Sequence, residues 1–224
     1  MKKFSKYIDG TILRPDATIR QIRNLCNEAL EFDYASVCVN PYFVNLAYKF
    51  LKGTPVNTCT VIGFPLGASA IAIKKLEAGL ALKEGANELD MVINISALKE
   101  KNYNFIEQEI SQLVKIAHSG GAILKVIIET CLLSYNEKIE ISKIVSSSGA
   151  DFIKTSTGFS SAGATIDDVE LLKTNVSADV KVKASGGIKT YPFAKQLIDA
   201  GADRLGTSAG SVIIEEYLRI NQQK

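Results

Sequence analysis

Histidine and paired cysteines are scarce in this chain, and their scarcity excludes several kinds of chemistry. His118 is the single histidine, and no second metal ligand stands near it at a useful spacing. Because zinc sites draw on several His, Cys or carboxylate ligands, we expect neither a metal nor another cofactor. The chain, at 224 residues, is too long to need a disulfide framework, and its cysteines are scattered without a CxxC pair, at Cys26, Cys38, Cys59 and Cys131. Reduced thiols in a cytoplasmic protein are therefore expected.

The chain also lacks a strong net charge and any long apolar run. Its 26 basic and 24 acidic residues leave a formal charge of +2, which gives no long-range field for nucleic acid or an acidic membrane. No uncharged stretch reaches the length of a bilayer, so neither a membrane span nor an export segment is expected. With 46% hydrophobic and 22% charged residues, the composition is that of a globular protein.

Short apolar runs alternate with longer amphipathic ones along the whole sequence. This rhythm is typical of parallel strands joined by crossover helices. We expect eight strands, near 7–9, 35–39, 57–62, 88–93, 123–128, 152–154, 180–184 and 204–206. Eight such units in 224 residues predict one (β/α)₈ TIM barrel over residues 1–224, a fold that typically takes about 250 residues. A doubly wound open sheet is the alternative, but it would need a glycine-rich loop after the first strand, and residues 10–15 read GTILRP.

Local signals mark several helix ends. Thr18 is a candidate N-cap for a helix whose apolar stripe we assign to the core, namely Ile19, Ile22, Leu25, Cys26, Ala29 and Leu30. Thr165 and Asp168 have the spacing of a capping box. A weak repeat of Gly-Ala-Asn or Gly-Ala-Asp predicts left-handed helix ends at Gly85, Gly149 and Gly201.

Nearly every predicted strand carries one unusual polar residue within its apolar run. These are Asp9, Cys38, Asp90, Lys125, Lys154 and Lys183. Any one of them alone is as well explained by an ion pair at the barrel rim. As a set they favour convergence at one barrel mouth, where barrel enzymes place catalytic groups.

Lys154 and Lys183 stand one strand-helix-strand unit apart and are expected on neighbouring strands. Two ammonium groups about 5.5 Å apart repel by roughly 3 kcal/mol at an effective dielectric constant of about 20, which is worth about two pKa units. Burial adds to this effect. The pair therefore predicts an uncharged amine able to attack a carbonyl carbon.

Glycine-rich segments follow the last two predicted strands. Ser185-Gly186-Gly187 comes after the seventh strand and Gly206-Thr207-Ser208 after the eighth. Each alone is more typical of a turn. Loops at these two places form the usual phosphate site of barrel enzymes, so the two together predict a bound phosphate.

Six longer motifs in this order together resemble the 2-deoxyribose-5-phosphate aldolase family, from about Ile8 to Gly210. They are VCVNP (37–41), GFPLG (63–67), ELDMVIN (88–94), LKVIIET (124–130), FIKTSTGF (152–159) and VKASGGI (182–188). The resemblance implies a class I, Schiff-base aldolase on a (β/α)₈ barrel, acting without a cofactor. Its reaction interconverts 2-deoxy-D-ribose 5-phosphate with acetaldehyde and D-glyceraldehyde 3-phosphate, in the breakdown of deoxyribose phosphates.

The resemblance also implies roles for individual residues. Lys154 would form the imine, Lys183 would lower the pKa of Lys154 and assist proton transfer, and Asp90 would give and take protons through water. Four residues would line the sugar pocket, namely Asp9, Thr11, Cys38 and Lys125. Five would hold the phosphate, namely Gly158, Gly186, Gly187, Gly206 and Ser208, and Thr157 would also bind the substrate. The expected partner is a small phosphosugar, and the sequence leaves open whether the chain forms a homodimer or a higher homo-oligomer.

The chain departs from the family pattern at several positions. Gly10 stands where many relatives have histidine, which we expect to loosen the barrel mouth, and Arg14 replaces a lysine. Ala209 replaces a second serine, so one phosphate hydrogen bond is expected to be missing. Some relatives end in a catalytic tyrosine, but this chain ends in Lys224, and Tyr217 lies in a helical pattern. Another Schiff-base lyase for a phosphosugar or keto acid, or an inactive phosphosugar-binding barrel, remains as an alternative.

Overall fold

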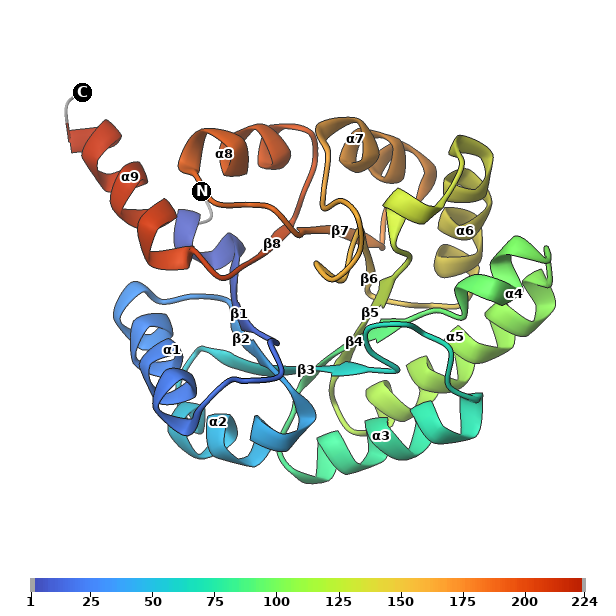
Figure 1. Ribbon diagram of the computed structural model, residues 1–224, viewed down its shortest axis with the longest axis horizontal. Coiled ribbons are helices and arrows are strands. Elements are labelled where there is room, and N and C mark those ends of the chain that lie inside the picture. The colour runs from blue at the N-terminus through green and yellow to red at the C-terminus, as the bar shows by residue number, and fades with distance from the viewer. Residues whose placement is uncertain (1–2, 223–224) are drawn as a thin grey trace.

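The structure, a computed structural model that describes residues 3–222, is a closed barrel of parallel strands (Figure 1). Over this range eight strands pair in sequence order and β8 closes onto β1. Their bounds are β1 Ile8–Ile12, β2 Ser36–Val39, β3 Asn57–Ile62, β4 Glu88–Val92, β5 Ile123–Ile127, β6 Phe152–Lys154, β7 Lys181–Ser185 and β8 Arg204–Thr207. The predicted (β/α)₈ barrel is confirmed, and the strand positions differ from prediction mainly in β1, which continues to Ile12.

Helices surround the strands (Figure 1). They are α1 Ile19–Phe32, α2 Val44–Leu51, α3 Ile71–Lys83, α4 Ile95–Lys99, α5 Tyr103–Ser119, α6 Tyr135–Ser147, α7 Ile166–Asn175, α8 Tyr191–Asp199 and α9 Gly210–Gln222, with 3-10 turns η1 Phe4–Tyr7, η2 Pro41–Phe43 and η3 Thr130–Leu132. Within residues 3–222 no helix is both long enough and apolar enough to cross a membrane.

Alternate residues along each strand face the helices or the barrel interior. The outward side chains, such as Leu89 and Val126, form the main hydrophobic core with the helices. Two groups of buried side chains stand apart from this core. A small apolar cluster is formed by Leu13, Cys38, Cys59 and Val61. Beside it the interior holds buried charged groups, namely Asp9, Glu88, Asp90, Lys125, Lys154 and Lys183.

Helix α1 begins as predicted, but fewer of its apolar residues are buried than predicted. Thr18 caps it through a capping box with Gln21. Ile19 is 50% exposed and Leu30 38% exposed, so the assignment of these two to the core was wrong. At 100° per residue they lie at the edge of the stripe, beyond the buried residues between them.

The other predicted helix ends are confirmed with one correction. Gly85, Gly149 and Gly201 all have positive φ, at +105°, +78° and +111°. The Thr165 hydroxyl accepts from the Asp168 amide as expected, but the carboxylate of Asp168 pairs instead with Lys138 at 2.5 Å. The N-cap is therefore present, and the reciprocal half of a capping box is replaced by an ion pair between α7 and α6.

Gly10 faces the helices rather than the barrel mouth. A Cβ at this position would lie 3.0 Å from Leu25 Cδ1 and 3.1 Å from Tyr34 Cδ2. Tyr34 is fully buried and donates its hydroxyl to Glu28 at 2.7 Å. The expectation of a looser barrel mouth was therefore wrong, because the tyrosine ring already fills the space beside the glycine.

The C-terminal helix α9 packs on the N-terminal turn. The Tyr217 ring stacks on Phe4 with centroids 4.8 Å apart, so Tyr217 has a packing role. It lies within helix α9, as its helical pattern indicated. Lys224 lies outside the described residues.

Candidate active site

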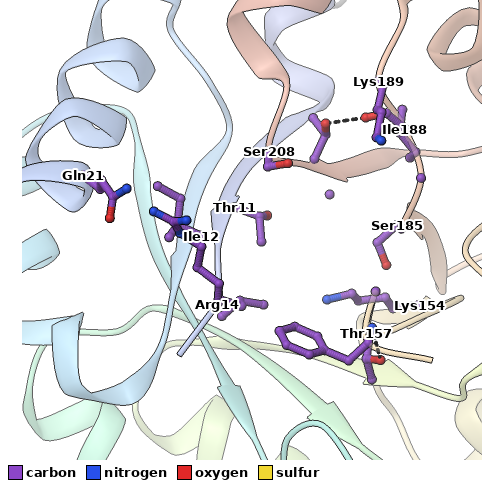
Figure 2. Close-up of a pocket in the computed structure, with 17 residues that line it drawn as sticks. Thr11, Ile12, Arg14, Gln21, Lys154, Thr157, Ser185, Ile188, Lys189 and Ser208 are labelled. Atoms are coloured by element: carbon purple, nitrogen blue, oxygen red, sulfur yellow. Dashed lines mark hydrogen bonds between the residues drawn. The ribbon is translucent and has the colours of Figure 1, made fainter. Parts of the chain in front are cut away.

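A cavity of about 530 Å³ opens at the carboxyl ends of β1, β6, β7 and β8 (Figure 2). Eight predicted site residues line it, namely Thr11, Lys154, Thr157, Gly158, Gly186, Gly187, Gly206 and Ser208. The two glycine-rich segments thus meet at one end of the barrel, together with the last residue of β6.

Lys154 ends β6 and presents its amine to this cavity, as Figure 2 shows. Only 3% of the residue is exposed, and its Nζ donates to Asp90 Oδ2 at 2.7 Å. An amine that is nearly buried yet borders a cavity is accessible to a ligand inside the cavity and shielded from bulk water. This placement suits a nucleophile.

Asp90 lies at the centre of the charged interior. Its Oδ1 accepts from Lys125 Nζ at 2.8 Å and from the Cys59 thiol at 3.2 Å. Its Oδ2 accepts from both Lys154 and Lys183, at 2.7 and 2.8 Å. Burial alone would raise the pKa of Asp90, but the three ammonium groups, Lys125 first, hold that pKa well below its usual range. Asp90 is therefore an ionised carboxylate at neutral pH.

Lys183 is fully buried on β7, in register with Lys154 on β6. It pairs with Asp9 Oδ2 at 2.6 Å as well as with Asp90. Burial alone would lower the pKa of Lys183, but Asp9 and Asp90 raise it above its ordinary value. The structure thus corrects the picture of two unscreened cations, because a carboxylate oxygen lies between them and Lys183 stays charged.

Three predicted pocket residues lie deeper in the barrel than the cavity wall. Asp9, Cys38 and Lys125 are fully buried, and none belongs to the cavity lining. Asp9 and Lys125 hold Lys183 and Asp90, respectively. Contact between these three residues and a sugar stays a prediction.

A cation would be poorly held in this interior. In the described part of the chain, the Cys38, Cys59 and Asp90 side chains bring three potential metal ligands within 4.8 Å of one another. The same carboxylate already pairs with Lys125, Lys154 and Lys183. These ammonium groups would repel a metal ion, so the donor set does not suit one.

The glycine-lined end of the cavity needs glycine for its shape. Gly158, Gly186 and Gly187 have φ of +85°, +85° and +77°. A Cβ on Gly186 would also lie 2.9 Å from the Cα of Gly163. The backbone there has the conformation and the close approach that only glycine permits without strain. Ser208 and Lys189 stand on one side of the cavity in Figure 2, and Lys154 and Thr157 on the other.

Thr157 is fixed by a residue that the sequence did not single out. Its amide donates to Glu129 Oε1 at 3.1 Å, and its hydroxyl also donates to the Glu129 carboxylate. The same hydroxyl accepts from the Phe159 amide at 3.1 Å. Glu129 itself adopts a left-handed backbone with φ of +56°. The segment that follows β5 therefore sets the position of the loop that follows Lys154.

The cavity also has lining residues that sequence analysis did not assign to the site. Four of them are Arg14, Gln21, Phe159 and Lys189. Lys189 follows the glycine pair by two residues, a signal that could have been used. Gln21 gave no such signal, because it belongs to α1 and reaches the cavity only through the packing of that helix.

The chain is similar to known proteins over almost its full length. Residues 5–214 match the family described as DeoC/LacD family aldolase. The chain is 51% identical to the deoxyribose-phosphate aldolase of Caldanaerobacter subterraneus subsp. tengcongensis, covering 97% of this chain and 94% of that protein. It is 50% identical to the deoxyribose-phosphate aldolase of Thermococcus kodakarensis, covering 96% of each.

A solved structure agrees with these sequence matches. The deoxyribose phosphate aldolase from Aeropyrum pernix, described as a unique tetrameric structure, superposes with a TM-score of 0.90 at 33% identity. The match covers 97% of this chain and 92% of that one. The chain therefore belongs to the DeoC/LacD family of aldolases.

Proposed function

We propose that this aldolase reversibly cleaves 2-deoxy-D-ribose 5-phosphate to acetaldehyde and D-glyceraldehyde 3-phosphate through a Schiff base on Lys154. The observation that carries the proposal is the placement of the Lys154 amine, on a cavity wall with a carboxylate at 2.7 Å and a glycine-lined end opposite. Relatives of about 50% identity carry the name deoxyribose-phosphate aldolase over nearly the same length.

The first half of the reaction builds the imine. The uncharged Lys154 amine adds to the sugar aldehyde carbon, and the resulting carbinolamine loses water to give a protonated imine. Asp90 Oδ2, in contact with Lys154 Nζ, is placed to accept a proton and to stabilise the cation that forms. Lys183 shares this oxygen and is the ammonium group placed to return a proton.

The second half breaks the carbon chain. The protonated imine draws electrons from the bond between sugar carbons two and three, while the hydroxyl on carbon three gives up its proton. Glyceraldehyde 3-phosphate leaves, and the enamine on Lys154 is protonated at carbon two and hydrolysed to acetaldehyde. The backbone amides around Gly186 and Gly187, with Ser208 and Lys189, would hold the phosphate at the opposite end.

Trapping of the imine tests this proposal. We expect borohydride, added with 2-deoxy-D-ribose 5-phosphate, to leave a stable secondary amine at Lys154 that mass spectrometry of peptides locates. Lys154→Ala should not be labelled. Lys195→Ala is a matched control, because this exposed lysine pairs with Asp199 on α8 and does not line the cavity, so the variant should label like the wild type. Absence of labelling in the wild type, or undiminished labelling in Lys154→Ala, would refute the proposal.

We further propose that residues 1–224 act as one catalytic domain in a homo-oligomer in the cytoplasm. Helix α3 supports self-association, because Ile73, Leu76 and Leu80 follow one face and are 48%, 64% and 61% exposed. The relative from Aeropyrum pernix is described as tetrameric. Light scattering coupled to gel filtration tests this, and Leu76→Glu should yield smaller particles if the face is buried between copies.

A further inference from the structure

Two charged residues outside the assigned site join opposite walls of the barrel interior. Glu88 begins β4 and Arg204 begins β8, and these strands lie four apart around the closed sheet. Arg204 donates from one nitrogen to Glu88 Oε2 at 2.7 Å and from Nε to Asp9 Oδ1 at 2.7 Å. Asn57 also donates to Glu88, at 2.8 Å. The guanidinium thus spans the interior below the cavity.

These contacts complete a closed ring of alternating charges. Arg204 touches Asp9 and Glu88, Lys183 touches Asp9 and Asp90, and Lys125 touches Glu88 and Asp90. All six ion pairs measure 2.6 to 2.8 Å. Each cation has two carboxylate partners and each carboxylate has two cation partners, so the ring is electrically neutral.

Lys154 is a seventh charged group attached to this ring from outside. Its one ion pair among the described residues is with Asp90, whose two oxygens already serve Lys125 and Lys183. When Lys154 is protonated the buried cluster carries four cations and three carboxylates. An uncompensated charge is costly in a buried site, and the Lys154 ammonium is the one charge of this cluster beyond the neutral ring.

We propose that Glu88 and Arg204 are positioning residues that keep this ring balanced, so that Lys154 is the group that gives up its proton. The inference rests on the proposed Schiff-base function. It predicts that loss of the Glu88 charge lowers the pH at which the imine forms and that loss of the Arg204 charge raises this pH. Neither residue lines the cavity, so each acts through its partners.

The other groups that face the cluster fit this account. Cys38 and Cys59 approach Asp90 from β2 and β3, and Lys125 Nζ lies 3.5 Å from Cys59 Sγ. At the base of the barrel, Lys181 Nζ lies 5.6 Å from the centre of the Phe152 ring and Arg204 Cζ lies 6.0 Å from it. Lys181 of β7 and Arg204 of β8 therefore both lie near the same aromatic ring.

The test is the pH profile of imine formation with acetaldehyde, trapped by cyanoborohydride and read by intact-protein mass spectrometry. Glu88→Gln removes a negative charge, so the midpoint should fall by about one pH unit. Arg204→Met removes a positive charge, so the midpoint should rise by a similar amount. The double variant Glu88→Gln with Arg204→Met restores the charge balance, so its midpoint should return close to that of the wild type. Arg204→Lys keeps the positive charge, so its midpoint should also stay near that of the wild type. A purely structural role would lower the rate without shifts of opposite sign.

Each outcome supports or overturns the inference. Glu88→Gln is nearly isosteric and keeps an acceptor for Arg204, so it decides the question by itself if Arg204→Met does not fold. Circular dichroism establishes folding for every variant. Unchanged midpoints in folded variants, or shifts of the same sign, would overturn the proposed role of the ring. If the wild type is still labelled in that case, the Schiff-base proposal is unaffected. A wild type that never labels would instead remove the proposed function itself.

Discussion

Replacement of Lys183 by leucine tests how strongly one buried cation controls another. Lys154 and Lys183 both donate to Asp90 Oδ2, at 2.7 and 2.8 Å, so their nitrogens are at most about 5.5 Å apart. At an effective dielectric constant of about 20, the repulsion at this distance is about 3 kcal/mol, or about two pH units. Without Lys183 this repulsion disappears and Asp90 is shared by fewer cations. Lys154 should then hold its proton more tightly.

The expected result is a rise of about two pH units in the midpoint of imine formation. It is measured by cyanoborohydride trapping of acetaldehyde across the pH range, with folding followed by circular dichroism. Asp9 keeps Arg204 as a partner in this variant, which favours a folded protein. Lys183→Arg retains the charge and should keep the midpoint near that of the wild type. An unchanged or lower midpoint in folded Lys183→Leu would refute the electrostatic reasoning.

Three further predictions concern other parts of the molecule. Lys74→Met should lower the free energy of unfolding by about 3 to 5 kcal/mol, because it leaves the buried Glu109 carboxylate without its ion-pair partner. The double variant with Glu109→Leu should regain much of this stability, as measured by chemical denaturation. Gly186→Ala should raise KM for the phosphorylated sugar by about tenfold or more, because the added methyl group displaces the backbone against Gly163. In the same steady-state assays, KM for unphosphorylated 2-deoxyribose should stay nearly unchanged. Gly10→His should destabilise the fold by about 1 to 3 kcal/mol through collision with the buried ring beside it, and an unchanged Tm would contradict this packing argument.

The sequence by itself determined the barrel and the residues at its mouth. Local chemistry determines the strand runs, the Thr18 cap and the helix ends at glycine. The spacing of apolar residues, two in strands and 3.6 in helices, can be read without coordinates. The position of Lys154 at the end of a short strand, and of glycines after β7 and β8, followed from the same local patterns. Parallel strands in a barrel bring their carboxyl ends together, so the cavity lining could be anticipated from order along the chain.

Only the tertiary structure decided which charges pair. Closure of the sheet brings β8 beside β1 and opposite β4, and this allows Arg204 to contact Asp9 and Glu88, residues far away in the sequence. The same closure places a carboxylate oxygen between Lys154 and Lys183, where sequence reasoning expected direct repulsion. A side chain's charge is a local property of the sequence, whereas its partner depends on the distances that packing imposes, and Coulomb energy depends on both.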